Sequence, residues 1–402
     1  MNRLAYYCAL PLLVLACSGQ GVEPTPAPTP ATVPLGFDGT TTNGETALRN
    51  LDDAIASLAR AYEASPSETF LAQRIAALLN RASYAGNYDD FAVALDESAD
   101  YLERYPGSPE AHVTRSRVLS AVHLFREALA ELDEAERLGW PASVLERSRI
   151  TLELAVGTDA ALLEPRARAL VADQPEFANY NTLATVLANL GRFEEADAMY
   201  REAFTDFRDV SPFPVAFSFF ARGVMWGEMA NRPDLAKPLY EEAVRRLPSY
   251  SVGNVHLAEL ESEVDEGDEA VARLARLAEA VGDPEPAGLL SELTTDPARA
   301  AELSGIAAAR YDVLLSRHPE AFYDHGSEFF AGAGNDPDRA LQLALDNVAL
   351  RPIPRAFIVA IEAATAAGDE EQVCTLATDA ERFVSVHPVL AELVESLDRR
   401  CR

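Results

Sequence analysis

The sequence predicts an all-α protein built as an array of helical hairpins, and two observations carry that prediction. From Glu45 onward Ala, Leu, Arg and Glu dominate, and apolar residues recur at the three- and four-residue spacing of amphipathic helices. Prolines then recur every 33 to 40 residues along the chain. Because proline ends helices, this spacing indicates repeated helix-turn-helix units. The periodic prolines are Pro66, Pro106, Pro141, Pro175, Pro212, Pro248, Pro284, Pro319, Pro352 and Pro388.

The charge of the chain excludes one class of partner. The 402 residues include 34 Lys and Arg against 64 Asp and Glu, which gives a formal net charge of −30. A surface of this sign repels the phosphates of nucleic acids, so we expect no nucleic-acid partner. A hydrophobic content of 48% is ample for a packed core, so the bulk of the chain folds.

Residues 1–16 are typical of a secretory signal peptide, because a basic start precedes an apolar run that is too short to span a bilayer. The run ends in Val-Leu-Ala-Cys at residues 14–17, which resembles the lipobox of bacterial lipoproteins, although its first two residues depart from the usual Leu and small residue. The resemblance implies that Cys17 carries a lipid anchor. The alternative is an ordinary signal peptide with a chance cysteine. By analogy with enterobacterial sorting, Ser18 in place of Asp implies the outer membrane, with the soluble part in the periplasm.

Residues 17–45 are predicted to form a linker behind the lipidated cysteine. Prolines alternate with Thr and Ala in this stretch, and alternating prolines hold a backbone near polyproline II, at roughly 3.1 Å per residue. The linker would therefore act as a spacer between a membrane anchor and the folded array.

Residues 46–388 contain motifs that resemble the tetratricopeptide repeat, a helical hairpin of about 34 residues. Gly191 fits the tight turn between the two helices of the best copy, and Ala184 and Ala196 let those helices approach closely. The resemblance implies a right-handed superhelical solenoid of about nine hairpins, whose first helices line a concave groove. The best copy comprises Tyr180, Leu183, Ala184, Leu187, Gly191, Arg192, Phe193, Ala196, Tyr200 and Ala203.

Residues 389–402 are predicted to form a helix that caps the end of the array, because their apolar residues fall on one helical face. Cys374 and Cys401 are the cysteines that remain once Cys8 leaves with the signal peptide and Cys17 is lipidated. In an exported protein, such a pair is expected to form a disulfide that joins the last helix to the preceding hairpin. The alternative is two buried free thiols.

The concave groove that the family uses for binding gives this sequence its candidate interaction site. Asparagine offers both a donor and an acceptor to a peptide backbone, and methionine gives adaptable apolar contacts. The alternative is that the aromatic-rich stretch at 213–226 belongs to the core. The predicted partner-binding residues are Asn181, Thr185, Asn189, Arg222, Met225 and Met229.

A metal site is the second possibility in the sequence. His318, Asp324, His325 and Glu328 lie within eleven residues, and two imidazoles with a carboxylate can ligate zinc and leave a position open for water. The simpler interpretation places a histidine at a helix end, where a cation is favoured. No motif of a nucleotide-binding loop or a catalytic nucleophile appears, and no cofactor is predicted.

These observations together predict a lipid-anchored bacterial scaffold or assembly factor for an envelope complex. It would bind another protein or peptide segment in the groove of its repeats and would have no catalytic role. The alternative function is a zinc-dependent periplasmic enzyme that uses the repeats as a frame for binding its substrate.

Overall fold

The computed structural model describes residues 33–205, 207–262, 267–280, 282–397 and 399–401. This part of the chain forms twenty α-helices and contains no strand. The predicted signal peptide at 1–16, Cys17 and the first part of the predicted linker lie outside the described residues. Within them, no helix combines the length and the hydrophobicity that crossing a membrane requires.

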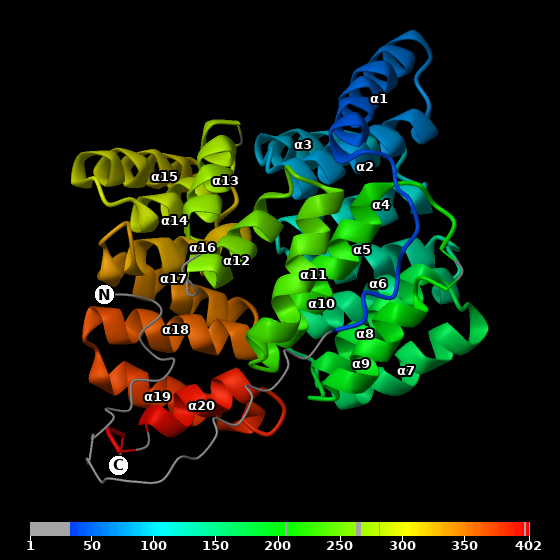
Figure 1. Ribbon diagram of the computed structural model, residues 1–402. Coiled ribbons are helices and arrows are strands. Elements are labelled where there is room, and N and C mark those ends of the chain that lie inside the picture. The colour runs from blue at the N-terminus through cyan, green and yellow to red at the C-terminus, as the bar shows by residue number, and fades with distance from the viewer. Residues whose placement is uncertain (1–32, 206, 263–266, 281, 398, 402) are drawn as a thin grey trace, which may run out of the picture.

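The helices follow one another along the chain with short connections (Figure 1). A π-helical turn, η1 (Met225–Met229), extends α10, and a short 3-10 helix, η2 (Glu381–Phe383), follows α19. The first ten helices are α1 (Gly44–Ala64), α2 (Glu68–Ala85), α3 (Asp89–Arg104), α4 (Pro109–Ala121), α5 (Phe125–Arg137), α6 (Ala142–Ala155), α7 (Ala160–Asp173), α8 (Phe177–Ala188), α9 (Phe193–Glu202) and α10 (Pro212–Val224). The others are α11 (Pro233–Arg246), α12 (Ser251–Ser262), α13 (Gly267–Ala280), α14 (Glu285–Leu293), α15 (Pro297–Arg317), α16 (Pro319–Ala331), α17 (Pro337–Leu350), α18 (Pro354–Ala367), α19 (Glu370–Ala380) and α20 (Pro388–Leu397).

Each even-numbered helix from α2 to α18 packs against the odd-numbered helix that follows it, so the helices form consecutive hairpins between α1 and α20. The even-numbered helices also contact one another, in the pairs α2 with α4, α6 with α8, α12 with α14, α14 with α16, α16 with α18, and α18 with α20. In a curved array the helices on the inside of the curve lie closest together, so the even-numbered helices form the inner layer. The predicted all-α solenoid of helical hairpins is confirmed.

The periodic prolines mark the start of each unit. Every one of them lies zero to three residues before the first residue of an even-numbered helix, from Pro66 before α2 to Pro388 at the start of α20. Proline is tolerated there because the first turn of a helix has no intrahelical partner for its amide. At the turn between α8 and α9, Gly191 has a φ of +70°, which favours glycine.

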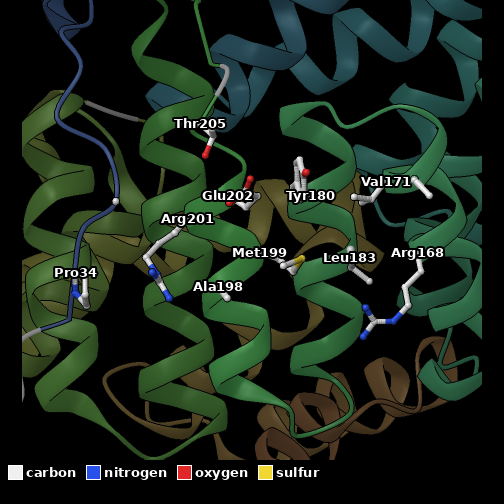
Figure 2. A pocket seen from close by; sticks show the side chains of 12 residues that line it. Pro34, Arg168, Val171, Tyr180, Leu183, Ala198, Met199, Arg201, Glu202 and Thr205 are labelled. Carbon is white, nitrogen blue, oxygen red and sulfur yellow. The ribbon is translucent and has the colours of Figure 1, made fainter.

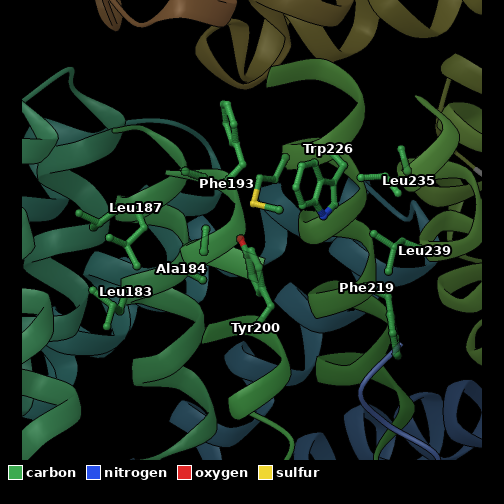
Figure 3. Close-up of a cluster of buried hydrophobic side chains, with 14 of the residues drawn as sticks. Leu183, Ala184, Leu187, Phe193, Tyr200, Phe219, Trp226, Leu235 and Leu239 are labelled. Atoms are coloured by element: carbon green, nitrogen blue, oxygen red, sulfur yellow. The ribbon is translucent and has the colours of Figure 1, made fainter. Parts of the chain in front are cut away.

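The core runs along the array between the two layers, and its largest cluster surrounds α8 to α11 (Figure 3). Leu183, Ala184 and Leu187 on α8 are at most 2% exposed, and Ala196 and Tyr200 on α9 pack against them. These are the residues of the best repeat copy. The residues of the repeat motif are therefore the side chains that are buried between the two helices of a hairpin.

The array turns back on itself, so hairpin turns of its first half contact the starts of helices in its second half. The ring of His123, in the turn between α4 and α5, hydrogen-bonds the carbonyl of Glu320 at the start of α16 through Nδ1, at 3.0 Å. In the same way Tyr88 reaches Asp283 before α14, while Gly157 lies against Pro352 before α18. Gly191 lies against Val386, which precedes α20. The offset is twelve helices in each case, so the superhelix completes one turn over six hairpins.

Residues 33–43, which we call the strap, run in an extended form beside α9, α10 and α11 before α1 begins (Figure 1). Val33, Leu35 and Phe37 pack against the central core cluster. This part of the predicted 17–45 linker is therefore attached to the array and is not a free spacer. The physical reason is that its apolar residues alternate, which the proline content of the stretch obscured.

Candidate functional site

Two of the predicted groove residues, Asn181 and Thr185, lie on α8 in the inner layer, and a third, Asn189, directly follows its last residue. The Asn181 side chain donates to the carbonyl of Phe177 and is buried, and the Asn189 side chain donates to the carbonyl of Thr185, at 2.9 Å. The Thr185 hydroxyl donates to the carbonyl of Asn181, at 3.0 Å. These polar groups thus bond to the backbone of their own helix, which leaves them less hydrogen-bonding capacity for a peptide.

Two further groove predictions were wrong, because Arg222 and Met225 are each only 1% exposed. Arg222 is turned toward Asp197 on α9, and Nε lies 2.6 Å from the carboxylate. Met225 belongs to the central core cluster, and Met229 is half-buried against the same cluster. The groove interpretation assigned these residues to the inner surface, whereas their helix turns them toward the neighbouring hairpin.

The inner layer instead opens into a small cleft farther along the array, which we call the inner-face cleft. It encloses about 50 Å³ where α12, α14, α16 and α18 come together, with one residue contributed by α15. Its apolar floor is formed by residues such as Leu289 and Phe329, while charged side chains project from successive inner helices. The lining residues are Val255, His256, Glu259, Glu285, Gly288, Leu289, Glu292, Tyr311, His325, Glu328, Phe329 and Arg355.

The charged residues of the cleft form one connected network. Nδ1 of His256 lies 2.8 Å from Oε1 of Glu228, which belongs to η1. Arg355 bridges two elements, since its guanidinium lies 2.7 Å from Glu328 and 3.7 Å from Glu228. His325 lies between two carboxylates, 3.3 Å from Glu285 and 3.6 Å from Glu328. Five helical elements therefore share one set of ion pairs.

Burial and neighbouring charges shift the pKa values of this network. Burial alone would lower the pKa of His256 and of His325, but the facing carboxylates raise them to about 9 and about 8. Burial would raise the pKa of Glu228, yet His256 and Arg355 hold it at about 2. Burial raises the pKa of Glu285 to about 7, against the opposing effect of His325. Near neutral pH both imidazoles are therefore cationic, and Glu285 is poised to titrate.

The carboxylates of the cleft outnumber its cations. Glu228, Glu259, Glu285, Glu292 and Glu328 face His256, His325 and Arg355. Glu292 is exposed, and the Glu259 side chain is 41% exposed, so both are accessible to a ligand. An arrangement of this kind suits a lysine or arginine side chain of a bound polypeptide, which would enter among carboxylates above an apolar floor.

Among the charged residues of this cleft, sequence reasoning found only His325 and Glu328, because the others lie on different repeats. Glu228, His256, Glu285 and Arg355 are 28 to 127 residues apart and form no local motif. The sequence pattern that could have predicted them is a charged residue on the inner face of the first helix of each successive hairpin. Reading it requires the register of every repeat, and the copy at 285–319 departs from the family pattern.

The structure does not gather the four predicted zinc ligands at one point. The ring of His318 packs edge-on against Phe91, and the Asp324 carboxylate pairs with Arg351. Only His325 and Glu328 share the cleft. Among the described residues, no group of three His, Cys, Asp or Glu side chains is arranged to hold a metal ion.

Cys374 on α19 and Cys401 after α20 form a disulfide, with their Cα atoms 5.2 Å apart. The bridge holds the end of the chain against the last hairpin. Helix α20, predicted as part of a capping helix at 389–402, buries Leu390 and Leu397 in a second core cluster, which includes residues of α18 and α19.

Comparison with known proteins places one repeat in a family. Residues 178–205, which cover α8 and α9, match the tetratricopeptide repeat family, so the chain contains a tetratricopeptide repeat at its centre. Among curated proteins none matches the chain.

Several solved structures are similar to the chain at low identity. A chain of the APC/C hetero-tetramer Cut9-Hcn1 is 12% identical, with a TM-score of 0.45 over 83% of this chain and 64% of that one. This chain therefore spans less than two thirds of the length of that relative. A human IFIT1 dimer with PPP-AAAA is 15% identical, with a TM-score of 0.43 over 78% of this chain and 72% of that one. Yeast Tom70 is 14% identical, with a TM-score of 0.29 over 89% of this chain and 94% of that one.

Proposed function

We propose that this chain is a protein-interaction scaffold and that its inner-face cleft takes a cationic segment of a partner protein. The observation that carries the proposal is the meeting of successive inner helices at a cleft whose carboxylates outnumber its cations. A lysine or arginine of the partner would pair with Glu259 and Glu292, the two accessible carboxylates. The net charge of −30 would add long-range attraction for a basic segment.

We further propose that the scaffold is exported and anchored to the bacterial outer membrane through a lipid on Cys17, with its array in the periplasm. The support is the signal-like stretch at 1–16 and the lipobox-like end at residues 14–17. In this setting it would serve as an assembly factor for an envelope complex, and no catalytic step is assigned to it.

The anchor is tested by replacing Cys17 with Ala and following incorporation of a labelled fatty acid in cells. The expected result is loss of the label and release of the chain from the membrane fraction. A wild-type chain that carries no lipid and fractionates with soluble periplasmic proteins would exclude the anchor. That outcome would leave the proposed cleft untouched.

The cleft is tested by placing a photo-reactive amino acid at Leu289, which lines it, and mapping the crosslinked partner segment in intact cells. The control position is Asp338, which is exposed on the outer helix α17. We expect Leu289 to crosslink a segment that contains Lys or Arg, and Asp338 to leave that segment unlabelled.

A charge variant makes the test quantitative. Glu259→Gln together with Glu292→Gln removes two charges from the cleft, and Asp338→Asn together with Glu371→Gln removes two from the outer helices. The cleft variant should weaken partner capture by about tenfold, which corresponds to about 1.4 kcal/mol, whereas the outer variant should leave it unchanged. Equal effects of the two variants would show that the charge acts through the whole surface and that the cleft is not the site.

A further inference from the structure

The strap lies in its groove as an extended peptide would. From Val33 to Thr40 its odd-numbered residues are half-buried and its even-numbered residues are exposed, which is the two-residue period of an extended chain. Its backbone contacts come from helices more than 150 residues farther along the sequence. The strap is thus a tertiary ligand of the array, joined to it through α1.

Two buried arginines bind the backbone of the strap. Nη1 and Nη2 of Arg222 donate to the carbonyls of Leu35 and Pro34, at 2.8 and 2.7 Å, while Nε pairs with Asp197. Arg246 repeats the arrangement on α11, where Nη1 donates to the carbonyl of Gly39, at 2.6 Å. Carbonyl groups are present in every peptide, so these two contacts recognise an extended backbone without selecting its side chains.

Specificity comes from the aromatic side chain between the two arginines. The ring of Phe37 stacks on Phe204 at a centroid distance of 4.7 Å and meets Phe207 edge-on at 5.8 Å. The guanidinium of Arg246 lies 4.9 Å from the centre of the same ring. The groove therefore holds one aromatic residue of the strap in a slot of aromatic and cationic groups.

On one side of the strap the groove widens into an open cleft, shown in Figure 2. This cleft has a volume of about 690 Å³, and Pro34 and Gly36 of the strap form one of its walls. Its other walls come from α7, α8 and α9, with Tyr180 and Met199 among the lining residues and Arg168 at one side (Figure 2). A peptide in the position of the strap, with larger side chains in place of Pro34 and Gly36, would thus find additional contact surface in the open cleft.

We propose that the groove formed by α9, α10 and α11 is a second peptide-binding site, that the strap is its built-in occupant, and that an extended partner segment with an aromatic residue competes for it. A competing segment makes the same backbone contacts and gains the surface of the open cleft. This site is distinct from the inner-face cleft, so either proposal can fail without the other.

The test uses the full chain and a fluorescent peptide with the sequence of residues 33–43. In the wild type the tethered strap competes at high effective concentration, so the labelled peptide should bind weakly. Gly36→Ala should loosen the strap, because Gly36 has a φ of +80° and an added Cβ would lie 2.6 Å from Cγ of Arg201. The labelled peptide should then bind the variant at least about tenfold more tightly than the wild type.

Two controls locate the binding. A peptide that carries Phe37→Ala should lose most of its affinity for the Gly36→Ala chain. A photo-reactive group at the N-terminus of the original peptide should crosslink to residues of the open cleft, such as Tyr180 or Met199. Crosslinks confined to other surfaces would overturn the proposal, as would an Ala-substituted peptide that binds equally well.

Folding of the variant is followed by helical circular dichroism, and Phe37→Ala in the full chain serves as a second way to loosen the strap. The proposal requires that at least one of the two chains keeps its helicity and binds the peptide more tightly than the wild type. If both chains lose their helices, the strap is an inseparable part of the core and the proposal is wrong. The same holds if both keep their helices and neither gains affinity.

Discussion

The strap groove and the inner-face cleft are built from the same kind of helical hairpin, yet the charged residues of the groove are buried in fixed pairs whereas those of the cleft are partly exposed. In the groove, Arg222 and Asp197 are almost fully buried and their hydrogen bonds are directed at fixed partners. In the cleft, Arg355 and His325 are about a third exposed and share several carboxylates. A closed ion pair fixes structure, whereas an open network can titrate and can accept a further charge.

The largest expected effect comes from breaking the closed pair. Asp197→Ala removes the acceptor of Arg222 and also that of the Trp226 indole, and so leaves a buried cation without its counter-charge. We expect the free energy of unfolding to fall by about 3 to 5 kcal/mol, measured by urea denaturation. The matched control is Asp234→Ala, whose exposed pair with Arg232 should contribute less than about 1 kcal/mol. Similar losses from the two variants would remove the distinction between closed and open pairs.

The disulfide between Cys374 and Cys401 ties down the end of the array that contains the cleft. The bridged residues are separated by 27 positions, so reduction should cost about 3 to 4 kcal/mol by the loop-entropy model. Hydrogen exchange should locate the loss in α19 and α20, while α9 to α11 around the strap stay protected. Mass spectrometry of the purified protein under non-reducing conditions should detect the linkage. Two freely alkylatable thiols would contradict it.

The pH dependence of stability should come from the cleft. A histidine with a raised folded-state pKa stabilises the fold fully below its ordinary pKa of 6.5, and this contribution is lost as the pH rises through the folded values. Those values are about 8 for His325, which faces Glu285, Asp324, Glu328 and Arg355, and about 9 for His256, which faces Glu228, Glu259 and Arg355. We expect a loss of about 2 kcal/mol between about pH 7.5 and pH 9.5.

The titration of Glu285 does not contribute to the loss of stability between about pH 7.5 and pH 9.5. Its raised pKa favours the protonated folded form, so its contribution is lost earlier, as the pH rises from 4.5 to about 7. His325→Gln should remove the part of the loss that falls near pH 8 and leave the part near pH 9, which belongs to His256, and urea denaturation at a series of pH values can measure this. An unchanged curve in this variant would show that His325 is not raised as the geometry implies.

The smallest effect is expected at the end of α8, where the sequence predicted part of the binding groove. Asn189→Ala removes an amide that already donates to the carbonyl of Thr185 in its own helix. Stability should change by less than about 1 kcal/mol, and crosslinking of the partner from Leu289 in the cleft should be unaffected. A clear loss of partner capture would show that the end of α8 takes part in binding, as the sequence analysis predicted, and that the cleft is not the sole binding region.

The sequence determined the hairpins, because the signals for a hairpin are local. The periodic prolines locate the start of each unit, Gly191 marks a turn that needs a positive φ, and Ala184 and Ala196 mark the closest approach of two helices. Each signal depends on the geometry of a few neighbouring residues, so it can be interpreted without knowledge of the rest of the chain.

Only the tertiary structure decided which charges are buried and which meet. Arg222 has no mark in the sequence that distinguishes it from the many arginines on the surface, yet the return of the strap across α10 covers it. The cleft joins Glu228 to Arg355 across 127 residues because small rotations between successive hairpins curve the array and turn its inner helices toward one another. The sum of those rotations is a property of the whole array, and no single repeat contains it.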